Sequence, residues 1–155
     1  MNPAAAPMDT YLVIGNSNTR KASVVRSLTG CFNRSLRDIQ LANRDAPLRL
    51  YARVGALQES KTSAADFQQE VAGRRCGAVI CCLWPSANPL DPMRFPGAEA
   101  YLEQFIAAGW TIRRIAVLGQ NAGGIRSPLL RQFPQASTDP INLTAQQVRM
   151  HFGWC

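Results

Sequence analysis

The sequence predicts an α/β domain in three layers, doubly wound, with a mainly parallel sheet that carries helices on both faces. Short apolar runs of strand length alternate with segments of helical periodicity, and this alternation is typical of parallel sheets. Two runs, "AVICCL" and "IAVL", lack the apolar–polar alternation of a half-exposed strand. They fit strands that are covered on both faces. The 155 residues are enough for one domain.

The chain is expected to begin with a tail and a central strand. Residues 1–9, "MNPAAAPMD", are rich in proline and alanine, so we predict a flexible tail and a domain over 10–155. Residues 10–15 form an apolar run that ends in glycine, which predicts the central strand. A helix is expected over 22–29, because Gly30 supplies a typical helix end.

Two short strands and a second helix are predicted next. The strands cover 37–42 and 48–54, joined by the turn-like "NRDAP". The second strand alternates apolar and basic residues in "LRLYARV", which predicts one solvated face. Ser63, with Asp66 three residues later, predicts a capped helix start, and Gly73 marks its end.

The next segments are expected to add two buried strands and a strong helix. "CGAVICCLW" and "IRRIAVLG" are the strands, and the proline-rich "PSANPLDPMRFPG" must be a loop. The helix between them has an apolar face with spacings of three and four residues. That face comprises Ala98, Tyr101, Leu102, Phe105 and Ile106.

The C-terminal part has weaker signals. A short helix is predicted near Pro128–Phe133. Thr144 and Gln147 have the spacing of a capping box, which predicts that a final helix begins there. Ala145, Val148 and Phe152 would give this helix its apolar face.

The formal net charge of +7 favours anionic partners, such as nucleotides, nucleic acid or an acidic protein surface. Fifteen of the seventeen basic residues are arginine, which fits a GC-rich bacterial genome. The arginines are scattered, with no run of five, and this favours a solvated basic surface. Exposed aromatics interleaved with basic residues are not evident, so a nucleic-acid module is not indicated.

Cysteine usage and hydropathy indicate a cytoplasmic protein. The chain has five cysteines and one histidine but no Cys-x-x-Cys pair, which argues against a zinc site and a disulfide framework. Reduced thiols are expected. No apolar run approaches the about 18 residues of a membrane helix, and the N-terminus does not look like a signal peptide, so no membrane contact is predicted.

The turn after the first predicted strand carries the main candidate for chemistry. A phosphate-binding loop has the form G-x-x-x-x-G-K-[ST] between a strand and a helix. Its backbone amides surround phosphate oxygens, and its lysine reaches the outer phosphates. In this chain Gly15 matches the first glycine and Lys21 the lysine. The candidate phosphate-binding residues are Gly15, Asn16, Ser17, Asn18, Thr19, Arg20, Lys21, Ala22 and Ser23.

Two positions depart from this pattern. Arg20 replaces the second glycine, where a positive φ would cost about 1 kcal/mol. Ala22 replaces the hydroxyl that holds magnesium, and Ser23 is turned about 100° away around the helix. The alternative interpretation is a polar turn in which Lys21 and Arg20 are merely solvated.

With the stretch "GNSNTRKAS", the chain resembles the P-loop NTPases, and more loosely the small GTPases among them. The resemblance covers about 10–153 in element order but only Gly15–Ser23 in specific motifs. Gly55 lies where a small GTPase has its Asp-x-x-Gly switch, without the aspartate. Asn121 lies where the guanine motif Asn-Lys-x-Asp would be, without its lysine and aspartate. The missing residues are magnesium and base ligands.

The resemblance implies that the chain binds a nucleoside triphosphate, ATP or GTP, or another phosphate ligand. Lys21 would contact the outer phosphates, and Arg20 would add a second cation. Since no magnesium ligands are evident, we expect weak or absent hydrolysis. One alternative is a noncatalytic interaction protein that docks an acidic partner. Another is a small nucleotide kinase whose acceptor loop is "PSANPLDPMRFPG".

Two further residues are candidates for a functional role. Asp91, in the proline-rich loop, is either a displaced magnesium or base partner or, more simply, a turn residue. His151 lies late in the last predicted helix and is expected to serve packing or to lie on the surface.

Overall fold

The computed structural model describes residues 8–155, and the predicted tail over 1–9 therefore lies mostly outside the described residues. Within the described part, Met8 is buried and Asp9 already begins the first strand. The first strand thus begins one residue before its predicted start at residue 10.

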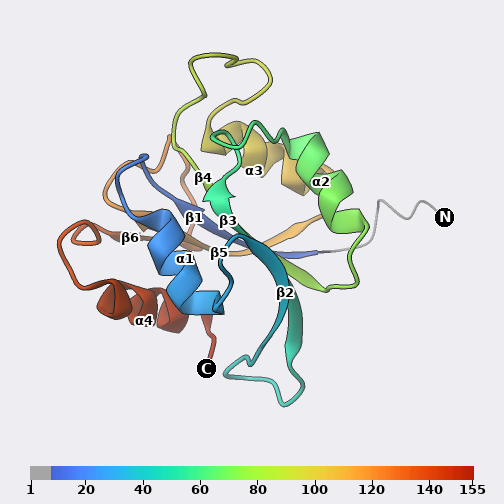
Figure 1. Cartoon of the computed structure of the whole chain (residues 1–155), viewed down its shortest axis with the longest axis vertical. Coiled ribbons are helices and arrows are strands. Elements are labelled where there is room, and N and C mark those ends of the chain that lie inside the picture. Colours follow the sequence, from blue (N-terminus) through green and yellow to red (C-terminus); the bar gives the residue numbers. More distant parts are fainter. Residues whose placement is uncertain (1–7) are drawn as a thin grey trace.

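The domain is an α/β structure built on one six-stranded sheet, with strand order β2-β3-β4-β1-β5-β6 (Figure 1). The strands are β1 (Asp9–Ile14), β2 (Arg34–Ile39), β3 (Leu48–Ala56), β4 (Ala78–Leu83), β5 (Thr111–Leu118) and β6 (Leu130–Phe133). The helices are α1 (Lys21–Thr29), α2 (Ala64–Ala72), α3 (Ala98–Ala107) and α4 (Ile141–Phe152). Every pairing is parallel except that of β2 with β3.

Helices cover both faces of the sheet, as the sequence predicts (Figure 1). One core lies under α1 and α4 and contains Val24, Leu28 and Val148. The other lies under α2 and α3 and contains Phe67 and Phe105. The adjacent Cys81 and Cys82 contribute to opposite cores because neighbouring side chains of a strand point to opposite faces. All five cysteines are free.

The chain reverses direction across the sheet at β1. β3 and β4 lie on one side of β1, and β5 and β6 lie on the other. In open α/β sheets, ligands bind beside the carboxyl ends of the strands at such a switch point. The loop that leaves β1, residues 15–20, occupies this place.

Two predictions for the C-terminal part are wrong. Residues 130–133 form strand β6, not a helix, and pair with β5. Helix α4 begins at Ile141 after Pro140, not at Thr144. Thr144 lies inside the helix with its hydroxyl buried and, among the described residues, without a hydrogen-bond partner. Proline is well suited to a helix start, so Pro140 was the better signal.

The predicted solvated face of β3 is confirmed at Arg49, which is exposed, but is wrong for the rest of the strand. Tyr51 and Arg53 point to this face, yet they are only 1% and 5% exposed, because α2 covers them. β2 begins at Arg34, three residues before its predicted start. On α3, Ile106 is 55% exposed and lies outside the apolar face to which it was assigned.

Candidate functional site

The loop after β1 folds back on itself around one carbonyl group. The backbone N–H of Thr19 donates to Asn16 O at 3.2 Å, and the Thr19 hydroxyl donates to the same oxygen at 2.7 Å. Lys21 Nζ also donates to Asn16 O, at 2.6 Å. The loop is therefore a closed turn rather than an extended segment. Its first residue must be small, because a Cβ on Gly15 would lie 2.3 Å from Thr19 Oγ1.

The nine candidate residues lie together at the carboxyl end of the central strand. Asn16, Ser17 and Asn18 form the exposed tip of the turn, whereas Gly15 and Thr19 are buried. Lys21 opens helix α1, and Ala22 and Ser23 follow in its first turn, where they are half-buried. The strand, turn and helix therefore have the order of a phosphate-binding loop.

Arg20 has the left-handed backbone conformation expected at the second glycine of the phosphate-binding loop pattern, the position that it occupies. Its φ is 64° and its ψ is 31°, in the left-handed region, at a cost of about 1 kcal/mol for a side chain. Its guanidinium Nη2 donates to Ala136 O at 2.7 Å and to Asp139 O. The side chain thus ties the turn to the segment between β6 and α4. Its charge is directed to those carbonyls rather than to the tip of the turn.

Lys21 is buried, with 6% of its surface exposed. Burial lowers the pKa of its amino group, while Cys82 and Glu59 act in the opposite direction. Cys82 lies on the neighbouring strand β4, where burial raises the pKa of its thiol to about 12, so the thiol stays protonated at neutral pH. The amino group is consequently held in a poorly solvated place, with one carbonyl as its partner in the protein.

The other sequence candidates at this edge have structural contacts. Asp91 Oδ1 accepts from the N–H of Arg94 at 3.3 Å, which is a turn contact. Asn121 Oδ1 accepts from the N–H of Gly123 at 3.0 Å. Gly55 lies inside β3 rather than in a loop. His151 Nε2 lies 3.0 Å from Ile115 O and 3.1 Å from Leu129 O, so it packs α4 against the sheet.

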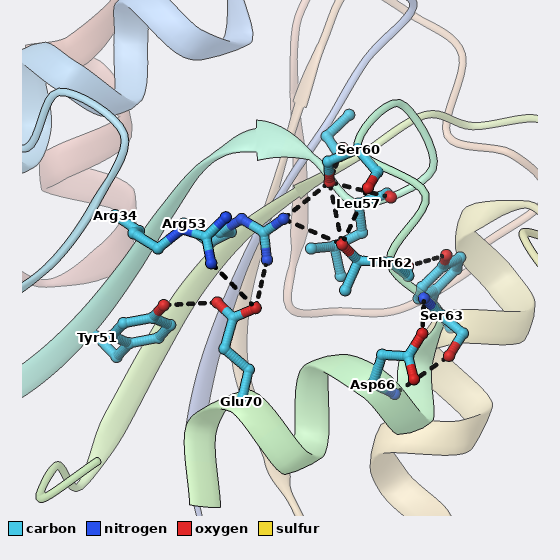
Figure 2. Close-up of polar contacts among 11 residues, drawn as sticks. Arg34, Tyr51, Arg53, Leu57, Ser60, Thr62, Ser63, Asp66 and Glu70 are labelled. Atoms are coloured by element: carbon cyan, nitrogen blue, oxygen red, sulfur yellow. Dashed lines mark hydrogen bonds and ion pairs between the residues drawn. The ribbon is translucent and has the colours of Figure 1, made fainter. Parts of the chain in front are cut away.

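A buried polar network lies beside the loop over 57–63 (Figure 2). Arg53 Nη1 donates to Glu70 Oε1 at 2.8 Å, and its Nη2 donates to Ser60 Oγ at 2.9 Å and Thr62 Oγ1 at 3.0 Å. The Tyr51 hydroxyl donates to Glu70 Oε2 at 2.5 Å. The network therefore joins β3, α2 and the loop between them.

Gln58 ties the same loop to the proline-rich segment that follows β4. Its side chain is fully buried. Its Nε2 donates to Trp84 O at 2.9 Å and Pro96 O at 3.1 Å, and its Oε1 accepts from the Trp84 N–H at 2.9 Å. Asn88 Nδ2 in turn donates to Gln58 O at 3.0 Å. Sequence reasoning missed Arg53 and Gln58, since their contacts depend on how β3, α2 and the loop after β4 pack together.

Within residues 8–155, no group of three or more His, Cys, Asp or Glu side chains is placed to hold a metal ion. None of the helices in this range is long and apolar enough to cross a membrane. Comparisons with protein-family models, curated proteins and solved structures found no match to this chain.

Proposed function

We propose that the chain binds a phosphate compound, such as ATP, GTP or pyrophosphate, at Gly15–Ser23, with weak or absent hydrolysis. The observation that carries this proposal is the pairing of a strained Arg20 backbone with the buried Lys21 amino group in one closed turn. Strained backbone of this kind persists where the surrounding structure demands it, often at binding sites. The turn lies at the sheet position where α/β domains bind ligands.

The chemistry of the turn suits an oxyanion. A lysine ammonium has three N–H donors, and Asn16 O takes one of them. The start of helix α1 adds a partial positive charge and free amides. An incoming phosphate oxygen would bind Lys21 in a poorly solvated place, where charge–charge attraction is stronger than in water.

Slow or absent hydrolysis follows from the residues around the turn. Phosphoryl transfer relies on metal ions that neutralise developing charge. Ala22 offers no hydroxyl, and the described residues provide no cluster of metal ligands. Arg20 donates to Ala136 O and Asp139 O, so it is not aimed at a transferred phosphoryl group.

The proposal can be tested by isothermal titration calorimetry, which measures the heat of binding. The ligands are ATP, GTP and pyrophosphate, each with and without magnesium. Lys21→Met should weaken binding at least about tenfold. Lys61→Met is the matched control, because Lys61 is the chain's other lysine and is exposed. Absence of binding for all three ligands, or equal affinity in Lys21→Met, would refute the proposal.

The pH dependence of this binding is a second readout. Because burial lowers the pKa of Lys21, its amino group loses its proton at a lower pH than an ordinary lysine. Affinity for pyrophosphate should therefore fall as the pH rises toward 10.5, the unperturbed value for lysine. An affinity that stays constant over this range would show that the ammonium group does not carry the binding.

A second candidate function is a noncatalytic interaction protein on the same scaffold. The contacts of Arg20 favour it, since the residue at the glycine position serves a structural link to Ala136 and Asp139. The net charge of +7 would then favour an acidic partner. This candidate predicts no heat of binding with any phosphate ligand.

A further inference from the structure

Strand β2 forms one edge of the sheet and, among the strands of residues 8–155, is the one that runs antiparallel to its neighbour and to the rest of the sheet. Edge strands expose a row of backbone N–H and C=O groups that can pair with another strand. At the tip of the sheet in Figure 1, β2 and β3 extend away from the helices as a long ribbon. No other described strand pairs with the outer side of β2 itself. Directly after β2, residues 40–42 pair with the C-terminal residues 153–155, so the open part of the edge is β2 alone.

The hydrogen-bond pattern identifies which residues of β2 point outward. The Val54 N–H donates to Asn33 O at 2.8 Å, so this position is a hydrogen-bonded pair of the β2–β3 ladder. Such pairs alternate with positions that turn their backbone groups away. The Gly77 N–H donates to Arg49 O, which confirms that Arg49 turns toward β4 rather than β2.

It follows that three residues of β2 turn their N–H and C=O groups to the free edge. These residues are Arg34, Leu36 and Asp38. On β3 they lie opposite Arg53, Tyr51 and Arg49, respectively. Their side chains share the face of the sheet that α2 covers, where Arg34 Nη1 lies 3.6 Å from Glu70 Oε1.

We propose that β2 is a dimerisation edge, at which a second copy of this chain adds its own β2 antiparallel. If the two copies meet at Leu36, a two-fold axis passes between the two leucines. Arg34 then lies opposite Asp38 of the second copy, and Asp38 lies opposite Arg34 of the second copy. In this register the six outward residues form three hydrogen-bonded pairs, and Arg37 Nη1 must release Leu36 O, to which it donates at 3.1 Å in the single chain. The two sheets join into one.

The charges of the edge select this register. Arg34 and Asp38 are 53% and 55% exposed, so both are accessible to a second chain. Opposite charges directly across an antiparallel pair are favourable, and like charges are unfavourable. Arg34 is not the main partner of Glu70, because Arg53 and Tyr51 both donate to that carboxylate. The guanidinium of Arg34 can therefore also pair with a carboxylate of a second chain. Asp38 contacts Arg49 at 3.3 Å at the surface.

A second copy fits this edge better than an unrelated strand because the pattern is self-complementary. Charged edges commonly prevent pairing by repulsion. Here, however, the symmetric register places unlike charges together at both ends. The strand has six residues, which is short for an interface, so we expect a weak dimer with a dissociation constant on the order of micromolar or above.

Charge reversal tests the register by sedimentation equilibrium at low salt. Arg34→Asp and Asp38→Arg should each weaken self-association about tenfold or more, since each creates two like-charge pairs in the symmetric dimer. An equimolar mixture of the two variants should form a heterodimer, because every cross pair is then Asp–Arg. The double variant R34D/D38R should regain self-association.

Matched controls separate register from net charge. Arg44→Asp and Asp45→Arg make the same charge changes in the turn between β2 and β3 and should leave the dimer unchanged. Circular dichroism checks that every variant is folded. The proposal is overturned if the parent chain stays monomeric at the highest concentration reached, or if the mixture associates no more tightly than either single variant.

Discussion

The loops after β1 and after β3 end at the same edge of the sheet, yet they are held in different ways. The first, residues 15–20, closes on its own Asn16 carbonyl and reaches the rest of the protein through Arg20. The second, residues 57–63, is held by side chains from β3 and by contacts with the loop after β4. The first loop thus has an exposed tip at residues 16–18, whereas the second is fixed by its contacts with β3 and with the loop after β4.

The largest expected effect comes from removing the support at Arg53. Arg53→Met removes the closest ion-pair partner of the Glu70 carboxylate, which is itself mostly buried. We expect a loss of about 3 kcal/mol in the free energy of unfolding, measured with urea. The control is Arg49→Met on the same strand, whose half-exposed pair with Asp38 should cost less than about 1 kcal/mol. Equal losses in the two variants would contradict a special role for the network.

Gln58 is expected to have the next largest effect. Gln58→Leu leaves the N–H and C=O of Trp84 and the carbonyl of Pro96 without these partners, at a cost of about 2 kcal/mol. Hydrogen exchange at the Trp84 amide should accelerate. Gln68→Leu is the control, because Gln68 is half-buried and has one long contact, to Gln104 O at 3.4 Å. An unchanged exchange rate at Trp84 would mean that packing alone holds the loop.

Arg20 allows backbone strain and side-chain contacts to be separated in the first loop. Arg20→Gly and Arg20→Ala both lose the contacts with Ala136 O and Asp139 O. Only glycine relieves the φ of 64°. We therefore expect the glycine variant to be more stable than the alanine variant by about 1 kcal/mol in thermal unfolding. Equal stability would show that the turn relaxes once the guanidinium is removed.

The smallest expected effect is a pH dependence from His151, which contacts Ile115 O and Leu129 O. Burial lowers the pKa of this imidazole below 6.5, so the unfolded chain binds its proton more readily than the folded chain. Stability should therefore fall as the pH drops through 6.5 to the lowered value. His151→Gln should remove this part of the slope in urea unfolding at a series of pH values. An identical slope in the two proteins would assign it to other groups.

Much of the fold could be predicted because its signals are local. The capping box of Ser63 and Asp66 and the apolar run of β4 both stand in the sequence and both form as expected. β6 was missed because an edge strand of four residues buries only Phe133 and so leaves little periodic pattern. The burial of Arg53 could not be predicted, since it depends on a carboxylate in a helix that packs against its strand.

For the candidate site, the sequence identified the residues but not their orientation. The spacing from Gly15 to Lys21 predicted a turn between strand and helix, and that turn is present. The direction of the Arg20 side chain depends on where 134–140 lies, and this segment follows a strand that sequence reasoning missed. Whether the turn binds phosphate remains a prediction.

The central place of β1 has a consequence for synthesis of the chain. β1 is made first, yet its sheet neighbours β4 and β5 come from the second half of the sequence. Until those strands leave the ribosome, the apolar residues of β1 have no sheet to join, whereas β2 and β3 can already pair as a local hairpin. The apolar residues of β1 therefore stay without their sheet partners until β4 and β5 have been synthesised.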